Sequence, residues 1–197
     1  MAKLHFKYGA MNSGKTDTLI KAAYNYTENG LHPIVIKAAI DTKGNDTIVA
    51  RIGTTRKVDI LADSNTDLHG AVMGIHCTKP VDCVFIDEAQ FLTPQQIDQL
   101  YEIAKTENIS VIAYGLRADF RTQMFPGAKR LFELCDNIEK IPTMCRCGAQ
   151  AEFNCRMVNG QFVEEGEQVA IDGEQKVTYT SLCGNCRKEE LSTTRNA

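Results

Sequence analysis

The fold class is indicated by the stretch Gly9-Ala10-Met11-Asn12-Ser13-Gly14-Lys15-Thr16. This stretch matches the phosphate-loop pattern G-x-x-x-x-G-K-[S/T] at every fixed position. It directly follows an apolar run at residues 4–8, which supplies the strand, loop and helix context that the pattern needs. Backbone N–H groups of such a loop surround phosphate oxygens at a helix N-terminus. We expect Lys15 to supply charge for the β- and γ-phosphates and Thr16 a hydroxyl for Mg²⁺. A plain glycine turn is the competing interpretation.

Two adjacent carboxylates follow a second apolar run, residues 81–86. In phosphate-loop proteins a carboxylate at this strand end holds Mg²⁺ opposite the loop hydroxyl, and we assign this role to Asp87. We expect Glu88 to point the other way and to accept a proton from the group that attacks the γ-phosphate. A solvated acidic strand end is the competing interpretation, and the phosphate loop upstream favours the functional one.

Length and charge restrict the classes of function. A chain of 197 residues forms one ordinary domain, or one domain with a small appendage. Its formal charge of −3 lacks the basic footprint of a nucleic-acid binder, so we expect no nucleic-acid partner. No apolar stretch approaches the roughly 20 residues of a membrane span, and no apolar signal region precedes Gly9. These features predict a cytoplasmic chain without a membrane partner.

The order of apolar runs predicts an α/β fold. Strand-like runs at residues 4–8, 33–38, 81–86 and 109–114 alternate with helical patterns, as in a parallel sheet that helices cover on both faces. One helix is expected from Gly14 to near Gly30, and another after Thr93, where Pro94 and Gln96 complete a capping box. Weaker helices are expected over residues 68–76 and 126–135. The polar segment 41–57 is interpreted as a mobile loop that can carry short strands.

Paired cysteines indicate a metal site in the last third of the chain. Cys145 and Cys147 lie about forty residues before Cys183 and Cys186, the layout of a tetrahedral four-thiolate zinc site, although the one-residue spacing of the first pair is rarer. A disulfide is disfavoured in a cytoplasmic chain. The other four cysteines, including Cys155, are interpreted as packed thiols. We therefore expect three segments: a P-loop ATP-binding domain at 1–141, a zinc-ribbon-like domain at 142–191, and a disordered tail at 192–197.

Apolar side chains at several strand ends predict a pocket beside the phosphates. Leu116, Phe120 and Phe125 follow the strand that ends near residue 114, and Phe91 and Met11 follow two other strands. Ligands of α/β sheets bind at the carboxyl ends of strands, so these five residues can line one apolar slot. Each alone is more often part of a core. Their gathering at one edge favours a pocket.

Four motifs, in this order, resemble the thymidine kinases of the small, zinc-containing type over almost the whole chain. They are residues 9–16, the run Asp87-Glu88-Ala89-Gln90-Phe91, residues 114–121, and the late segments Gly166-Glu167-Gln168-Val169 and Tyr179-Thr180-Ser181-Leu182-Cys183. The resemblance implies a RecA-like P-loop sheet with a small zinc domain and a lasso-like lid loop. It implies ATP-dependent phosphorylation of the 5′-hydroxyl of thymidine or deoxyuridine in pyrimidine salvage, by a homotetramer inhibited by dTTP.

The resemblance also assigns roles to residues. Glu88 matches the general base, and Asp87 and Gln90 join residues 9–16 in the ATP site. The nucleoside site matches Met11, Phe91, Leu116, Phe120, Phe125 and Tyr179, the last of these on a loop that closes over the nucleoside. Asp41 and Arg121 are expected nearby. One departure is a segment before Tyr179 that is about two residues longer than usual.

Two other classes remain open at this point. Asp87-Glu88-Ala89-Gln90 also resembles the tetrad of helicase-type P-loop ATPases, although a helicase normally needs a second motor domain. The third interpretation is a zinc-ribbon binding module whose nucleotide site switches its conformation. A kinase differs from both because its base must face a bound hydroxyl in a pocket that excludes water.

Overall fold

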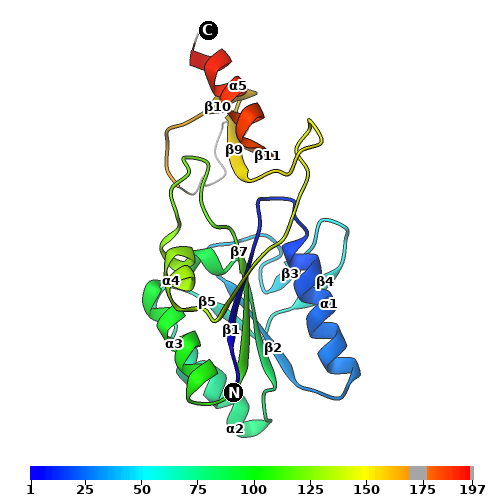
Figure 1. The fold of residues 1–197 in the computed structure, drawn as a ribbon. Coiled ribbons are helices and arrows are strands. Elements are labelled where there is room, and N and C mark those ends of the chain that lie inside the picture. The colour runs from blue at the N-terminus through cyan, green and yellow to red at the C-terminus, as the bar shows by residue number, and fades with distance from the viewer. Residues whose placement is uncertain (169–176, 196–197) are drawn as a thin grey trace.

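A six-stranded parallel sheet forms the centre of the computed structural model, which describes residues 1–168 and 177–195 (Figure 1). The strands lie in the order β5-β2-β6-β7-β1-β8, and every neighbouring pair is parallel. Their bounds are β1 Leu4–Tyr8, β2 Pro33–Ala38, β5 Ile60–Ala62, β6 Cys83–Asp87, β7 Ser110–Gly115 and β8 Asn137–Lys140. The predicted parallel sheet is confirmed, with β6 beginning two residues later than expected.

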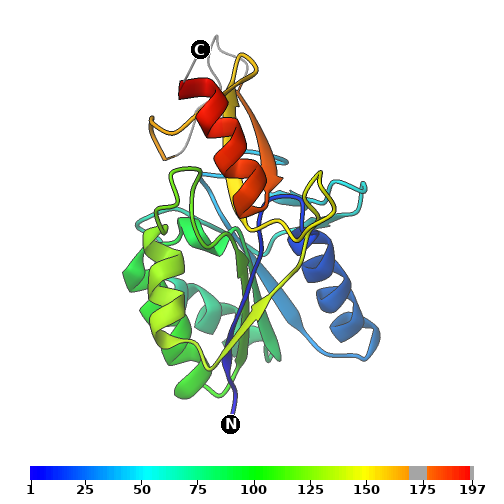
Figure 2. The same cartoon turned by 45° about the horizontal axis from the view of Figure 1, so that its top comes forward.

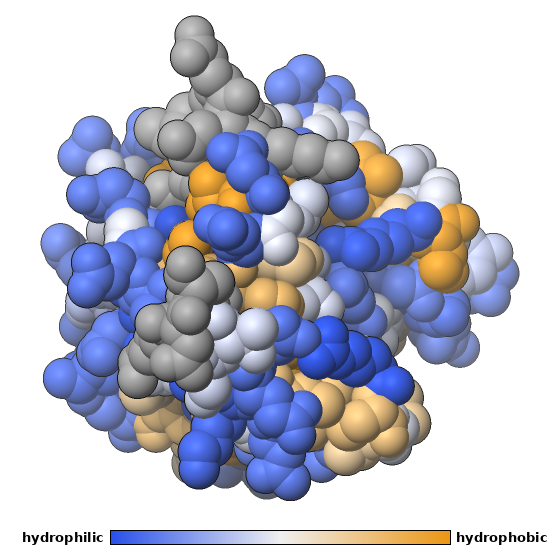
Figure 3. All heavy atoms as spheres, turned by 90° about the horizontal axis from the view of Figure 1, so that it is seen from above, coloured by the Kyte–Doolittle hydropathy of each residue, from blue (hydrophilic) through white to orange (hydrophobic). Residues whose placement is uncertain are grey.

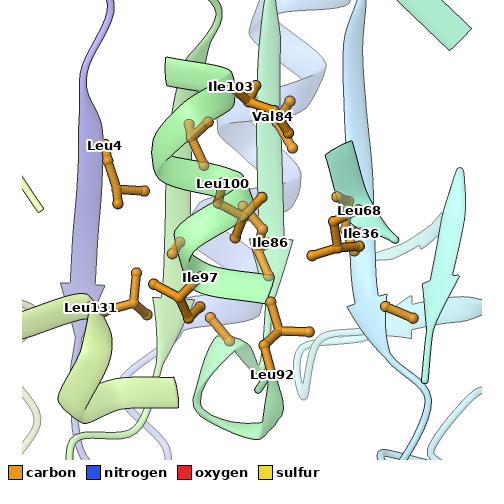
Figure 4. Packing of buried hydrophobic residues seen from close by; sticks show 14 of the residues in the cluster. Leu4, Ile36, Leu68, Val84, Ile86, Leu92, Ile97, Leu100, Ile103 and Leu131 are labelled. Carbon is orange, nitrogen blue, oxygen red and sulfur yellow. The ribbon is translucent and has the colours of Figure 1, made fainter. Parts of the chain in front are cut away.

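Helices cover both faces of this sheet (Figure 1). Helix α1 (Lys15–Glu28) packs on one face, and α2 (Leu68–Thr78), α3 (Pro94–Lys105) and α4 (Pro126–Leu134) pack on the other. Alternate residues of a strand point to opposite faces. Accordingly, Phe85 of β6 packs with Leu19 of α1, whereas Val84 and Ile86 pack with Leu100 of α3 (Figure 4). Burying each such side chain stabilises the folded state by about 1.5–3 kcal/mol. The apolar residues of the strands and helices therefore favour this layered arrangement.

The start of α3 follows the predicted capping box. The Thr93 hydroxyl accepts a hydrogen bond from the Gln96 backbone N–H, and the Gln96 side chain accepts one from the Thr93 N–H at 3.0 Å. A cap of this kind contributes about 1 kcal/mol. It fixes the end of the connection from β6 through the short helix η1 (Ala89–Phe91), which carries site residues.

The segment predicted as a loop, residues 41–57, contains a short hairpin of β3 (Thr47–Val49) and β4 (Thr55–Lys57). Lys37, at the end of β2, is fully buried and anchors this segment. Its Nζ donates to the carbonyls of Lys43 at 2.5 Å and Asn45 at 3.2 Å, and it forms an ion pair with Asp41 at 3.3 Å. A buried ammonium needs such partners, and they hold the segment beside the carboxyl end of the sheet.

A second, antiparallel sheet stands beyond the carboxyl ends of the main strands (Figures 1 and 2). Its order is β10-β9-β11, with β9 at Phe153–Val158, β10 at Gln161–Val163, β11 at Val177–Leu182, and helix α5 (Gly184–Arg195) packed on it. We call this sheet, α5 and residues 143–151 the cysteine module. The tail predicted from Ser192 differs: α5 continues to Arg195, because strong helix formers precede these residues. The Ser192 and Thr193 hydroxyls donate to carbonyls four residues earlier in the helix.

In the described part of the chain, none of the helices is long and apolar enough to cross a membrane.

Candidate active site

Lys15, the lysine of the phosphate loop, is buried and folds back over its own loop. Its Nζ donates hydrogen bonds to the backbone carbonyls of Gly9 at 3.2 Å and Ala10 at 3.0 Å. Burial lowers the pKa of Lys15, whereas the carboxylates of Glu88 and Asp87 raise it. The Lys15 ammonium is therefore buried where it can bind an anion, and phosphate oxygens can replace the Gly9 and Ala10 carbonyls as its partners.

The loop backbone adopts the conformation that its glycines permit. Gly14 has a φ of +76°, in the left-handed region that favours glycine, and it precedes the first residue of α1. A Cβ on Gly9 would lie 2.4 Å from the Ser13 Oγ and 2.7 Å from the Ile141 carbonyl oxygen. Both fixed glycines of the motif are thus required by the local backbone geometry. This geometry supports a phosphate loop more strongly than the sequence pattern alone.

Thr16 and Asp87 meet at the loop, as the sequence predicts for a magnesium site. The Thr16 Oγ1 donates to the two carboxylate oxygens of Asp87 at 3.3 and 3.1 Å. Burial raises the pKa of Asp87 to about 7, and the neighbouring Glu88 carboxylate raises it as well. Because hydroxyl and carboxylate oxygens are the ligands that Mg²⁺ prefers, this pair fits the ion chemically.

A cavity of about 320 Å³ lies over the phosphate loop. Besides loop residues, it is lined by Lys43, Arg51 and neighbouring residues of the segment that Lys37 anchors. The charge of Arg51 also lowers the pKa of Lys15. Sequence analysis missed both cations, although basic residues in a polar, glycine-flanked loop were the available signal. They add positive charge where a triphosphate would lie.

A second cavity, of about 240 Å³, contains all six predicted nucleoside residues. Phe91 and Phe125 meet edge to face, with ring centroids 5.5 Å apart. Asp119, Asn154 and Gln168 also line it, and sequence analysis assigned none of them to the site. Its full lining is Met11, Asp41, Glu88, Gln90, Phe91, Leu116, Asp119, Phe120, Phe125, Asn154, Gln168 and Tyr179. Aromatic walls with a few polar groups are typical of a site for a flat, polar ring.

Glu88 lines both cavities and joins them. It follows the last residue of β6, has a left-handed φ of 52° and is half-buried, so the backbone turns away from the strand at this residue. Gln90, which sequence analysis grouped with the ATP site, lines the second cavity instead. Its amide donates to Glu88 Oε2 and accepts from the Leu116 N–H at 2.9 Å, which orients the carboxylate.

The cysteine module contacts the phosphate loop through residues that sequence analysis missed. Asn154 accepts a hydrogen bond from the Met11 N–H at 2.8 Å, and the Ser181 hydroxyl donates to the Met11 carbonyl at 2.6 Å. Asn154 and Ser181 are paired residues of β9 and β11. The other Asn154 contact is a hydrogen bond from its side-chain amide to the Ala118 carbonyl, at 3.0 Å. Viewed from the module's side, the surface is largely hydrophilic, with small hydrophobic areas (Figure 3).

The four predicted metal cysteines, Cys145, Cys147, Cys183 and Cys186, converge so that their sulfurs all lie within 4.8 Å of one another. Hydrogen bonds from the backbone N–H groups of Cys147 and Cys183 lower the pKa of Cys145 to about 6, which favours the thiolate that binds metal. Four clustered sulfurs are the donor set of structural zinc sites. Cys155 is buried beside them, and burial raises the pKa of its thiol to about 11, as expected of a packed thiol.

Of the loop around Tyr179 that is expected to close over the nucleoside, the structure describes residues 168 and 177–181. The lengthened segment before Tyr179 lies mainly outside the described residues, so its path stays a prediction. Tyr179 itself lines the second cavity, and Arg121 contacts the same region by donating to the Gly166 carbonyl at 3.1 Å.

Comparison with solved structures agrees with the predicted P-loop fold. The chain is similar to a solved ATPase domain, with a TM-score of 0.52 and 13% sequence identity, over 90% of this chain and 80% of that one. Together with the parallel sheet, this likeness confirms the predicted α/β fold of the RecA-like kind.

Comparison with protein families and curated proteins identifies the family. The thymidine kinase family model matches residues 2–187. The chain is 41% identical to a thymidine kinase of Agrobacterium fabrum, over 93% of this chain and 94% of that protein. It is 44% identical to one of Legionella pneumophila, over 93% and 88%, and 38% identical to one of Photobacterium profundum, over 97% and 99%. The chain therefore belongs to the thymidine kinase family, a family of phosphotransferases.

Proposed function

We propose that the chain transfers the γ-phosphoryl group of ATP to the 5′-hydroxyl of thymidine or deoxyuridine, in pyrimidine salvage. The single observation that carries this proposal is the position of Glu88 on both cavities. The cavity over the phosphate loop is assigned to ATP, and the apolar second cavity to the nucleoside. A carboxylate at their junction is placed for a hydroxyl that approaches from one side and a γ-phosphate from the other.

The phosphoryl transfer follows from this arrangement. The 5′-oxygen attacks the γ-phosphorus while its proton passes to Glu88, and the bond from the γ-phosphorus to the β–γ bridging oxygen breaks. The products are the nucleoside monophosphate and ADP. Lys15 and the backbone N–H groups of residues 9–16 hold the phosphates, and Gln90 orients the base. The hydrogen bond between Gln90 and Glu88 supports this last role.

Magnesium, when bound, offsets charge on the phosphates, and Thr16 and Asp87 are the residues that would hold it. Zinc would be held by Cys145, Cys147, Cys183 and Cys186 and would stabilise the cysteine module. Four free cysteines side by side also suit a reducing compartment, so we place the protein in the cytoplasm.

The nucleobase would lie among the side chains of the second cavity. Met11, Leu116 and the phenylalanines supply apolar walls, and Tyr179 supplies an aromatic wall from β11. An ATPase would need Glu88 to activate water, whereas this apolar cavity beside it suits an organic acceptor. The same observation argues against a nucleotide-switched binding module, which needs no acceptor pocket.

Feedback by dTTP is consistent with the layout of the two cavities. They share Met11, Glu88 and Leu116, so one molecule that contains both a thymine base and a triphosphate could occupy them together. A homotetramer is proposed on the family relationship, and β8 offers an edge with Ile138 half exposed. We retain residues 1–141 and 142–191 as the two domains, since β8 ends at Lys140 and the remaining described strands form a separate sheet.

The assay that tests the proposal supplies ATP labelled at the γ-phosphate with each nucleoside in turn. Transfer of label to thymidine or deoxyuridine supports it. Release of inorganic phosphate at the same rate with and without nucleoside would support the ATPase instead.

A further inference from the structure

Arg156 is a buried cation without a carboxylate partner among the described residues. It belongs to β9, its exposed fraction is 4%, and none of the ion pairs formed within residues 1–168 and 177–195 includes it. A guanidinium stays charged in proteins, so its burial must be compensated by other contacts. Most of those contacts are with residues that line the second cavity.

Each of the three guanidinium nitrogens donates a hydrogen bond. Its Nε donates to the Tyr179 hydroxyl at 2.8 Å, its Nη1 to the Glu167 carbonyl at 2.7 Å, and its Nη2 to the Gln168 carbonyl at 3.1 Å. The planar fork of arginine suits such a set of acceptors, which a lysine ammonium cannot reproduce. One side chain therefore fixes three residues from two segments of the chain.

The same guanidinium also lies over two aromatic rings. Its Cζ is 3.8 Å from the centroid of the Phe120 ring and 5.3 Å from that of Tyr179. Phe120, Tyr179 and Gln168 all line the second cavity, but Arg156 does not. It therefore lies behind the wall of the cavity and holds three of its lining residues.

A neighbouring contact network reinforces the same wall. Asp119 accepts hydrogen bonds from Gln168 Nε2 at 3.3 Å and from Arg121 Nε at 3.0 Å. Arg156 and Tyr179 are paired residues in the register of β9 and β11, two residues from the Asn154 and Ser181 pair that holds Met11. Since alternate residues share a face, this face of the small sheet is directed at the substrate cavities.

We propose that Arg156 is a positioning residue for the nucleoside: it sets the Phe120 and Tyr179 rings and the Gln168 backbone that enclose the base, without touching the reacting atoms. This inference rests on the proposed function of the second cavity. It predicts an effect on the nucleoside and not on ATP, because none of the contacts of Arg156 described above reaches the phosphate loop.

The test is a steady-state comparison of Arg156→Gln, Arg156→Lys and the surface control Arg130→Gln, with thymidine and ATP varied separately. Wild-type transfer to thymidine must be seen first, since its absence would refute the proposed function and not the role of Arg156. In both Arg156 variants we expect the KM for thymidine to rise by about tenfold or more, with the KM for ATP and kcat within about twofold. The Arg130→Gln control should match wild type.

A parallel fall in kcat with a rise in both KM values would overturn the proposal, because that pattern indicates a general structural role. Full activity of Arg156→Lys would also overturn it, since the fork geometry would then be unnecessary. Tyr179→Phe removes only the hydroxyl that Arg156 binds, and it keeps the test open if the Arg156 variants misfold. Alone it should raise the thymidine KM by about threefold, and an unchanged thymidine KM would contradict the proposal. Where Arg156→Gln folds, it should add nothing in that background. Independent, additive effects would contradict the proposal.

Discussion

The backbone N–H of Met11 donates a 2.8 Å hydrogen bond to Oδ1 of Asn154, so the cysteine module holds the phosphate loop at its centre. Ser181 is the strand partner of Asn154, and its hydroxyl donates to the Met11 carbonyl. Met11 lines both cavities. The module therefore positions a residue that is expected to contact both substrates.

Ser181→Ala tests this link. The variant removes the donor to the Met11 carbonyl, and an unpaired buried polar group costs about 1–3 kcal/mol. Because Met11 lines both cavities, we expect the KM values for ATP and for thymidine to rise together, unlike the nucleoside-only effect expected at Arg156. Ser192→Ala is the matched control, since its hydroxyl lies in α5, on the surface. A change in only one KM would contradict the link.

Arg51→Gln tests the cation that the sequence did not identify. Arg51 lines the cavity over the phosphate loop, where its charge should favour a triphosphate. We expect the KM for ATP to rise by about tenfold, equivalent to ~1.4 kcal/mol, with the KM for thymidine unchanged. Initial rates at increasing salt give a second measure, because screening should shrink the difference between the variant and wild type. An unchanged KM for ATP at low salt would exclude this role.

Asp87→Asn should stabilise the fold in a pH-dependent way. Burial raises the pKa of Asp87 to about 7, above its ordinary value of 3.8. The folded state therefore holds the proton more tightly, and the stability this gives is complete below pH ~4 and lost as the pH rises through about 7. Asparagine mimics the protonated form, so its advantage in free energy of unfolding should grow between pH 4 and 8. The growth should be about 1.4 kcal/mol for each pH unit between the two pKa values.

Urea unfolding of both proteins across this range, without added magnesium, provides the measurement. A difference that stays constant with pH would show that the Asp87 carboxyl is not destabilised by burial.

Zinc removal should loosen the cysteine module before the ATP-binding part. The four sulfurs are the contacts that a metal would cross-link, whereas the main sheet has its own apolar core. With a strong zinc chelator we expect hydrogen exchange to increase first in residues 143–168 and 177–190, and later in β1, β6 and β7. Simultaneous loss of protection in both parts, or no change in either, would contradict the proposed domain boundary.

The sequence predicts those features whose signals are local. The phosphate loop, the capping box at Thr93 and the buried strands each depend on a short pattern with its own physical cause, and all three are found. The apolar residues of the second cavity could also be predicted, because the carboxyl ends of parallel strands meet at one edge of the sheet.

Arg156, Asn154 and Ser181 could not be found in this way. They are polar residues of short strands, and only the register of β9 against β11 shows that they share a face, where Asn154 and Ser181 bind Met11. The position of Gln90 depends equally on a contact that is distant in sequence, with Leu116. A tail was predicted there because the last few residues of a chain are often poorly ordered, whereas the helix formers before residue 192 extend α5.

The proposed phosphoryl transfer depends most on Glu88 as the base that accepts the proton of the 5′-hydroxyl. The direct measurement is single-turnover transfer of labelled γ-phosphate from magnesium ATP to thymidine by Glu88→Gln, beside equilibrium binding of ATP to the same protein. We predict unchanged ATP binding and a transfer rate lower by a factor on the order of a hundred or more, since glutamine cannot take the proton. Transfer at a rate near that of wild type would remove Glu88 from the mechanism and contradict the account.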